Sequence, residues 1–249
     1  ESIGTLASGV AHEINNPVQG IMNYAELISE SPGASVEIRE YASEIDRESQ
    51  RVATIVRNML AFSRQEGERG ARPTTVQKII EGALSLIRTV LRKDQIGLSI
   101  AIAEGLPELC CRQQQIQQVL MNLVTNARDA LNARFSDFDE RKRIEIRAES
   151  FLREDRTWIR LSVCDQGGGV PDSVVPQIFD PFFTTKGRDQ GTGLGLSVSH
   201  GIVTEHGGEL QLENRPGVGA CFDVELPADG SGVEARRREA SGGDESEES

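Results

Sequence analysis

Residues that commonly bind transition metals are scarce in this sequence. Its 249 residues include four cysteines and three histidines, and no two cysteines form a Cys-x-x-Cys pair. A zinc site is therefore not expected. With so few cysteines, a reducing compartment such as the cytoplasm is the simplest setting for the chain.

Long apolar runs and an excess of positive charge are also missing. No apolar run approaches the ~20 residues that a membrane-spanning helix needs, and no signal peptide is recognisable. Lysine and arginine number 27 against 39 acidic residues, which gives a formal net charge of −12. Because nucleic-acid binding needs clustered basic residues, we expect no nucleic-acid partner, and no membrane contact by this segment. The sequence starts abruptly at Glu1 inside a predicted helix, so we expect a further part upstream.

The first segment, residues 1–66, contains two heptad seams separated by a break at Ser31-Pro32-Gly33. The first seam consists of Ile3, Ala7, Val10, Ile14, Pro17, Ile21, Tyr24 and Ile28, and the second of Ile38, Tyr41, Ile45, Glu48, Val52, Ile55, Met59 and Phe62. Two such helices joined by a short turn predict an antiparallel α-helical hairpin. Because two helices cannot enclose a core, we expect a homodimer in which two hairpins form a four-helix bundle.

Residues 71–228 mix helix and strand patterns and predict a second domain. We expect helices near residues 76–91, 112–132 and 194–206, and strands near residues 96–101, 143–148, 158–165, 209–213 and 220–226. Several of these strands alternate apolar and charged residues, as half-buried strands do. The predicted fold is an α/β sandwich, with a mixed sheet and helices on one face. After Pro227 the composition turns to Gly, Ser, Glu and Arg, so residues 229–249 are predicted to form a disordered acidic tail.

One histidine lies on the polar face of the first predicted helix. His12 stands opposite the seam, and Ser8 and Asn16 lie one turn away on the same face. Pro17 cannot donate to the carbonyl of Glu13, so a bend is predicted beside His12, at a cost of ~3 kcal/mol. Taken alone, these features also fit an ordinary surface histidine on a bent helix.

The run around this histidine is His12-Glu13-Ile14-Asn15-Asn16-Pro17. It resembles the phosphoacceptor box of two-component sensor histidine kinases, in the class whose box is His-Glu-x-x-Asn-Pro. The resemblance implies that His12 attacks the γ-phosphate of ATP and that Glu13 orients the ring and helps to take its proton. A neutral imidazole with a pKa near ~6.5 is a good nucleophile at cell pH. The resemblance also implies that Asn16 takes part in dephosphorylating the response regulator. The alternative is that Asn16 only hydrogen-bonds backbone groups that Pro17 leaves unpaired.

The predicted helix 112–132 has a polar stripe opposite its core face. The core face consists of Ile116, Val119, Leu120, Leu123, Val124, Ala127 and Leu131, and the stripe of Gln118, Asn122, Asn126 and Asp129. Amide oxygens on one face suit Mg²⁺, which keeps waters and phosphates as its other ligands, although a solvated helix face has the same pattern.

The run Asn-Leu-Val-Thr-Asn-Ala-Arg-Asp-Ala, which begins at Asn122, resembles the N box of the same kinases. The resemblance implies that Asn126 binds the metal and that Asn122 and Asp129 belong to the ATP site. In related ATPases that hydrolyse ATP, a glutamate at the position of Asn122 acts as the base that activates water. A neutral amide cannot act as this base, which favours transfer of the phosphoryl group to a protein over hydrolysis.

A carboxylate follows the strand predicted at residues 158–165. Asp165 falls on the buried face by the period of two, and Gln166-Gly167-Gly168-Gly169 comes next. A buried carboxylate is costly unless a donor satisfies it, and the amino group of adenine would do so. A strand end with a glycine turn is the plain alternative. The run resembles the G1 box of the kinases, which implies that Asp165 binds adenine and that Gly167 and Gly169 belong to the site.

Two further runs complete the set. Phe179-Asp180-Pro181-Phe182-Phe183 resembles the F box, which places Phe179 in the ATP site, although clustered aromatics also fit a loop held in a core. Lys186, in the loop that follows, can reach phosphates. Gly191-Thr192-Gly193-Leu194-Gly195 opens a predicted helix, where free N–H groups bind phosphate, and it resembles the G2 box.

These five motifs stand in the order found in the family and cover most of residues 1–226. The resemblance implies ATP-dependent autophosphorylation on His12 with Mg²⁺, followed by transfer to an aspartate of a response-regulator receiver domain. It places the segment in the cytoplasm, either as part of a cytoplasmic protein or as the cytoplasmic part of a membrane-bound sensor. The alternatives are a degenerate ATP-binding scaffold, a hydrolysing ATPase of the same fold, and a bare coiled-coil module, which leaves the second domain unexplained.

Overall fold

The computed structural model describes residues 3–31, 33–46, 49, 52, 70–186 and 193–230. The chain divides into two compact units, one made of Glu1–Glu68 with Asp180–Val198 and the other of Arg69–Phe179 with Ser199–Ser249. Within the described ranges, no helix combines the length and the hydropathy that crossing a membrane requires.

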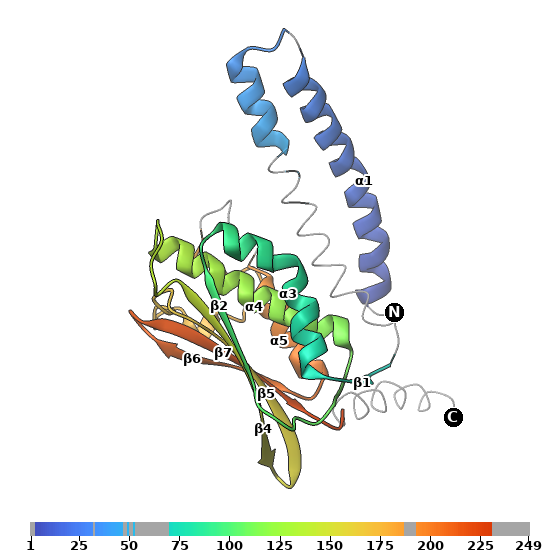
Figure 1. The fold of residues 1–249 in the computed structure, drawn as a ribbon. Helices are drawn as coiled ribbons and strands as arrows, with labels where there is room; N and C mark the ends of the chain where they lie inside the picture. The colour runs from blue at the N-terminus through green and yellow to red at the C-terminus, as the bar shows by residue number, and fades with distance from the viewer. Residues whose placement is uncertain are drawn as a thin grey trace, which may run out of the picture. The chain divides into compact units, whose positions relative to one another are not determined.

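The first unit contains the predicted helical hairpin. Helix α1 (Ile3–Glu30) continues through Pro17, and a second helix over residues 36–46 runs back alongside it (Figure 1). The Oγ of Ser35 accepts a hydrogen bond from the Ile38 N–H at 3.3 Å, as an N-terminal cap does. The hairpin is therefore confirmed, whereas the predicted seam positions Glu48, Ile55, Met59 and Phe62 lie outside the described residues.

Small side chains are buried in the hairpin and large apolar ones remain exposed. Val18 and Ala25 on α1 are buried, as are Ala42 and Ser49 on the returning stretch. The exposed apolar side chains of this unit's hairpin include Ile21, Tyr24, Leu27, Ile28, Val36, Ile38, Tyr41, Ile45 and Val52. Most of the described part of both seams is thus still open to solvent in one copy of the chain.

The second unit is built on a five-stranded mixed sheet. Its strands are β2 (Gly97–Ile102), β4 (Arg143–Arg153), β5 (Arg156–Asp165), β6 (Glu209–Arg215) and β7 (Gly219–Pro227), in the order β2-β4-β5-β7-β6. Strand β2 is parallel to β4, and the other neighbours are antiparallel. Two short strands, β1 (Arg72–Thr74) and β3 (Leu109–Cys111), pair with each other and were not predicted.

Helices cover one face of this sheet. Helices α3 (Val76–Lys93) and α4 (Gln113–Arg134) pack against each other, and α4 contacts β4 and β5 (Figure 1). The buried face of α4 consists of the seven predicted residues, Ile116, Val119, Leu120, Leu123, Val124, Ala127 and Leu131. Helix α5 (Gly195–Glu205) buries Ile202 and Val203. The predicted fold class, a helical hairpin followed by an α/β sandwich, is confirmed.

Two of the four cysteines are joined, a pair that local sequence patterns do not predict. Cys164 on β5 and Cys221 on β7 face each other in register, with Cα atoms 4.0 Å apart, and form a disulfide. They are 57 residues apart in sequence and carry no pairing signal until the strand order is known. Cys110 and Cys111 are not in a disulfide, and burial raises the pKa of the Cys111 thiol to about 12.

A buried histidine connects the end of α5 to the start of α4. His206 donates from Nδ1 to the carbonyl of Ile202 at 2.8 Å, and its Nε2 accepts from the Arg112 N–H at 3.1 Å. This pair of bonds needs a neutral ring. The pKa of His206 is lowered to about 4, chiefly by burial, while the hydrogen bond to the Ile202 carbonyl opposes the shift and the charge of Arg112 adds to it. These contacts give His206 a structural role at the C-terminal end of α5.

We expect stability of the folded chain to fall as the pH drops from 6.5 towards 4, in part through His206. The unfolded ring takes up a proton near its ordinary pKa of 6.5, whereas the folded ring resists protonation until about pH 4. The stabilisation is complete above pH 6.5 and is lost as the pH falls, by about 3 kcal/mol at most. Urea unfolding of the wild type and of His206→Gln between pH 4 and 7 measures this contribution as the difference between the two pH profiles. The matched control is His200→Gln, which removes an exposed histidine, and parallel profiles for wild type and His206→Gln would contradict the assignment.

Candidate nucleotide site and phosphoacceptor helix

The predicted phosphoacceptor residues lie within α1. Helical spacing puts His12 and Asn16 on one face, with Glu13 next to the first of them. Helical spacing continues this polar face to Gln19 and Asn23, which are exposed, and the Gln19 side chain donates to Asn23 Oδ1 at 3.2 Å. The polar stripe is therefore present on α1 where side chains are described.

The predicted N-box residues share a half-buried side of α4. Asn122, Asn126 and Asp129 are all only partly exposed, which differs from a freely solvated helix face. The Asn122 amide donates to the Oγ of Ser199 at 3.3 Å, and Ser199 is fully buried on α5. Asp129 accepts from Arg128 Nη1 at 3.4 Å. Asn122 thus lies at the junction of α4 and α5.

Other polar residues of α4 hold the helix to its neighbour. Arg128 Nε and Asn132 Nδ2 both donate to Asp94 Oδ2, the second at 2.9 Å, and Asp94 caps the C-terminal end of α3. Burial would raise the pKa of Asp94, but the hydrogen bonds from Asn132 and Arg128 outweigh it and hold that pKa below its usual range. These two side chains of α4 therefore have a structural role.

Asp165 ends β5 on the face of the sheet that packs against the helices. It stands opposite Ile144 of β4, whose side chain is fully buried, so the predicted orientation agrees with the register. Burial raises the pKa of Asp165, and the N–H groups of Gly167 and Ala220 lower it, the first by donating to Oδ1 at 2.7 Å. A carboxylate accepts about four hydrogen bonds, so these two donors leave capacity for an adenine amino group.

The glycines after Asp165 let the chain pass close to its neighbours. A Cβ on Gly167 would lie 2.5 Å from the Cβ of Ala130 on α4. Gly169 has a positive φ of +75°, and a Cβ there would lie 2.8 Å from the Arg215 carbonyl oxygen. Any other residue at these two positions would force the loop or its neighbours to shift.

Phe179 of the F box lies against a histidine. Its ring centroid is 5.1 Å from that of His200 on α5, so this aromatic side chain is half-buried in a ring contact. A short 3-10 turn, Val175–Gln177, leads into it. The alternative prediction, an aromatic that holds a loop to the core, fits the same contact.

Within the first unit, the F-box and G2-box segments touch. Phe182 has a positive φ of 67°, and a Cβ on Gly193 would lie 2.3 Å from the Phe182 carbonyl carbon. Lys186 donates its backbone N–H to Thr184 Oγ1 at 3.2 Å.

The glycine motif opens a helix, as predicted. Leu194 lies just before α5, and its carbonyl accepts from the Ser197 hydroxyl and the Val198 N–H, both at 3.0 Å. The helix itself begins at Gly195. Gly191 and Thr192 lie outside the described residues, as do residues 187–190.

Two residues that hold the glycine loop were not predicted. Arg134, the last residue of α4, donates from Nη1 to the carbonyls of Gln166 at 2.8 Å and Val218 at 2.7 Å. Asn214 on β6 donates to the carbonyl of Val170 at 2.7 Å and accepts from its N–H at 2.8 Å. A basic residue in the last turn of a helix is a weak signal for carbonyl binding, and a lone asparagine in a strand gives none.

Two protein families match this chain. Residues 111–230 match the histidine kinase-, DNA gyrase B- and HSP90-like ATPase family, and residues 2–68 match the His Kinase A phospho-acceptor domain. The two-component sensor PprA of Pseudomonas aeruginosa is 34% identical over 91% of this chain, and the match spans 24% of that protein. This chain spans less than half the length of the curated relatives it matches.

Solved structures lead to the same family. The catalytic domain of histidine kinase ThkA is 32% identical, with a TM-score of 0.53, over 64% of this chain and 97% of that one. ThkA in complex with response regulator TrrA is 28% identical, with a TM-score of 0.61, over 92% of this chain and 63% of that one. The fold and the site thus define a phosphoacceptor helical hairpin followed by an ATP-binding domain of the histidine kinase, gyrase and HSP90 type. The chain belongs to the two-component sensor histidine kinases.

Proposed function

We propose that this chain uses ATP to phosphorylate its own His12 and passes the phosphoryl group to an aspartate of a response-regulator receiver domain. The supporting observation is the half-buried carboxylate of Asp165 beside a glycine loop, in a chain that also has His12 on α1. The complex of ThkA with TrrA supports the choice of partner. We assign residues 1–66 to dimerisation and phosphotransfer, 71–228 to catalysis and 229–249 to a tail, and we place the chain in the cytoplasm, where reducing conditions would keep Cys164 and Cys221 as thiols.

In the proposed reaction a ring nitrogen of His12 forms a bond to the γ-phosphorus. The bond from that phosphorus to the bridging oxygen breaks, ADP leaves, and the ring proton passes to Glu13. Asp165 accepts a hydrogen bond from the adenine amino group, and the N–H groups at the start of α5 hold phosphate oxygens. A kinase is favoured over a degenerate scaffold because His12, Asn126 and Asp165 are all present.

The donor set fits Mg²⁺ at Asn126. Its amide oxygen is a hard neutral ligand, it is half-buried on α4, and Asn122 lies one turn before it. Mg²⁺ usually keeps several waters and binds substrate phosphates with only one or two protein oxygens, so a single amide oxygen beside the phosphates of ATP is compatible with this metal. Bound Mg²⁺ would neutralise charge on the phosphates of ATP.

Incubation with γ-labelled ATP and Mg²⁺ tests the proposal. We expect label on the protein that survives alkali and is lost in acid, as a phosphoramidate on histidine is. Nucleotide binding without any label would favour the scaffold instead. Release of labelled phosphate with no labelled protein would favour a hydrolysing ATPase.

We also propose that the chain dephosphorylates its response regulator, with Asn16 responsible. Asn16 lies one turn after His12 on α1, so a regulator docked at His12 would bring its aspartyl phosphate beside the amide. The amide can orient a water for in-line attack. Asn16→Ala is expected to label normally on His12 and to slow loss of phosphate from the regulator by about tenfold, the effect of about one lost hydrogen bond. If labelling falls instead, while regulator dephosphorylation is unchanged, Asn16 serves only the helix beside Pro17.

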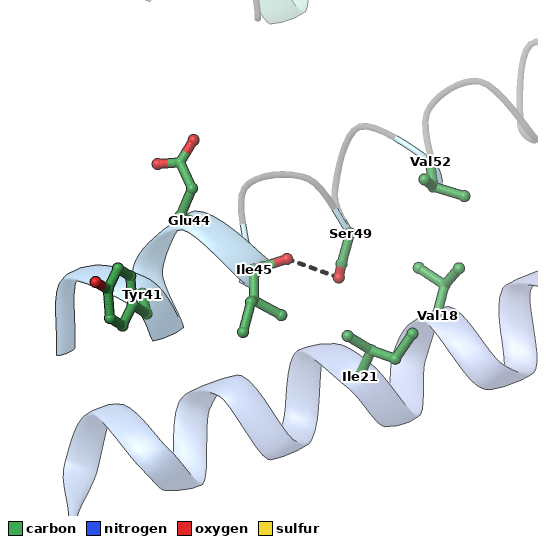
Figure 2. Close-up of a pocket in the computed structure, with 7 residues that line it drawn as sticks. All are labelled: Val18, Ile21, Tyr41, Glu44, Ile45, Ser49 and Val52. Atoms are coloured by element: carbon green, nitrogen blue, oxygen red, sulfur yellow. Dashed lines mark hydrogen bonds between the residues drawn. The ribbon is translucent and has the colours of Figure 1, made fainter. Parts of the chain in front are cut away.

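The hairpin offers an apolar groove for dimerisation. The groove is lined by Val18, Ile21, Tyr41, Glu44, Ile45, Ser49 and Val52 (Figure 2). Figure 2 shows Ile45 and Val52 pointing towards α1, and Glu44 pointing away from it. Ile45 is 43% exposed and Val52 is 38% exposed, so each buries only part of its apolar surface within one hairpin. A second copy of the hairpin would cover the rest, which supports a homodimeric four-helix bundle.

The double variant Ile45→Asp, Val52→Asp is expected to be monomeric. Two carboxylates in the bundle interior would lose hydration without a partner, at several kcal/mol in total. Sedimentation velocity measures the change in mass. Val36→Asp is the matched control, because Val36 is 75% exposed at the start of the returning helix, outside the groove. An unchanged dimer in the double variant would mean that the interface lies elsewhere.

A further inference from the structure

The loop after Asp165 leaves the sheet and loses its strand partners. Residues 166–170 follow the last residue of β5, yet the backbone N–H and carbonyl of Val170 are both hydrogen-bonded. A single side-chain amide, that of Asn214, makes both bonds, at 2.8 Å and 2.7 Å. An amide carries one acceptor oxygen and two donor hydrogens, so it can replace a neighbouring peptide group at this point.

Asn214 also fixes the glycine next to Val170. A Cβ on Gly169 would lie 2.9 Å from Asn214 Oδ1 and 3.0 Å from the Gly219 carbonyl oxygen, so the loop rests directly on β6 and β7. At the other end of the loop, Arg134 donates to the carbonyl of Gln166. The Gly168 N–H and carbonyl bond the turn between β6 and β7, with Gly217 N at 2.7 Å from the Gly168 carbonyl oxygen. The loop is therefore held at both ends, and Asp165 lies directly before it.

We propose that Asn214 is a positioning residue for the adenine site, which holds the loop 166–170 so that Asp165 and Gly167 face the base. The proposal rests on the proposed function, because it assumes that Asp165 binds adenine. The chemistry of the base makes the role measurable. Adenine presents an amino donor at position 6, where guanine presents a carbonyl acceptor. A carboxylate in the correct position therefore accepts from adenine and repels guanine, and a displaced loop loses part of that discrimination.

The experiment measures the dissociation constants of ATP and GTP, by calorimetry, for the wild type, Asn214→Ala, Asn214→Asp and Asp165→Asn. For Asn214→Ala we expect ATP affinity to fall about tenfold, as for the loss of one to two hydrogen bonds, with a smaller change for GTP. The ratio of the two constants should move towards that of Asp165→Asn. Gln211→Ala is the matched control, because Gln211 is an exposed amide on the same strand that bonds only to Glu209 among the contacts described.

Asn214→Asp keeps the experiment decisive if Asn214→Ala does not fold. It has almost the same shape and keeps an acceptor for Val170 N, but it loses the donor and brings a charge near Asp172, whose Oδ1 is 3.5 Å from the Asn214 amide nitrogen. We expect the same loss of discrimination, and faster hydrogen exchange confined to residues 166–170.

A role in stability alone would lower the melting temperature and leave both constants of the folded protein, and their ratio, unchanged. That result would overturn the proposal. The proposed function fails in a different way, if the wild type binds neither nucleotide or if Asp165→Asn binds ATP as tightly as the wild type.

Discussion

His12→Gln is expected to bind ATP with unchanged affinity and to take up no label from γ-labelled ATP. An amide nitrogen is not nucleophilic at neutral pH, so no bond to phosphorus can form at this position. Glutamine is close to histidine in size and keeps the polar character of the stripe on α1. Acid-labile label is measured after separation of protein from nucleotide, and ATP affinity is measured by calorimetry on the same preparation.

The matched control for this variant is Gln19→Ala. Gln19 belongs to the same polar stripe, is exposed, and bonds to Asn23 one turn away. We expect it to label at the wild-type rate. Label that persists in His12→Gln would assign the phosphoacceptor to another residue and would remove the basis of the proposed transfer to a response regulator.

Local periodicity was enough to predict much of this fold. The apolar face of α4 repeats with helical spacing, so all seven of its buried residues could be named in advance. The period of two along β5 placed Asp165 on the buried face, and its register opposite Ile144 agrees. These features depend on neighbours within one element, which the sequence shows directly.

Contacts that depend on strand order could not be predicted in the same way. Asn214 meets Val170 across 44 residues, and Arg134 meets Val218 across 84. Cys164 faces Cys221 only because β5 is the neighbour of β7. The hairpin of β4 and β5 also extends to Arg153, beyond the predicted strand end at residue 148, with Glu154 and Asp155 both at positive φ. A single sequence gives no register between distant strands, so these contacts carry no local signal.

Asn126→Ala is expected to lower the rate of Mg²⁺-dependent labelling of His12 by about a hundredfold or more. The substitution removes the amide oxygen proposed to bind the metal. Even the loss of a residue that only orients a metal ligand typically lowers metal affinity or activity ten- to a hundredfold. Labelling rates at saturating ATP, measured over a range of Mg²⁺ concentrations, should show a midpoint shifted to higher metal. Binding of ATP in the absence of metal should change little, because Asp165 and the glycine loop are untouched.

Two further variants separate loss of the metal ligand from damage to the helix. Asn132→Ala removes another amide of α4, one that donates to Asp94 Oδ2 at 2.9 Å, and should cost about 1 kcal/mol of stability while labelling continues. Asn126→Asp replaces one hard oxygen ligand with another, so it should recover part of the metal dependence that alanine loses. Asn126 would not be the ligand if Asn126→Ala labels His12 at the wild-type rate with the same Mg²⁺ midpoint. Asn132 donates to Asp94 at the end of α3 and is not proposed to bind the metal. If Asn126→Ala and Asn132→Ala lower the labelling rate equally, the effect would therefore come from the packing of α4 on α3.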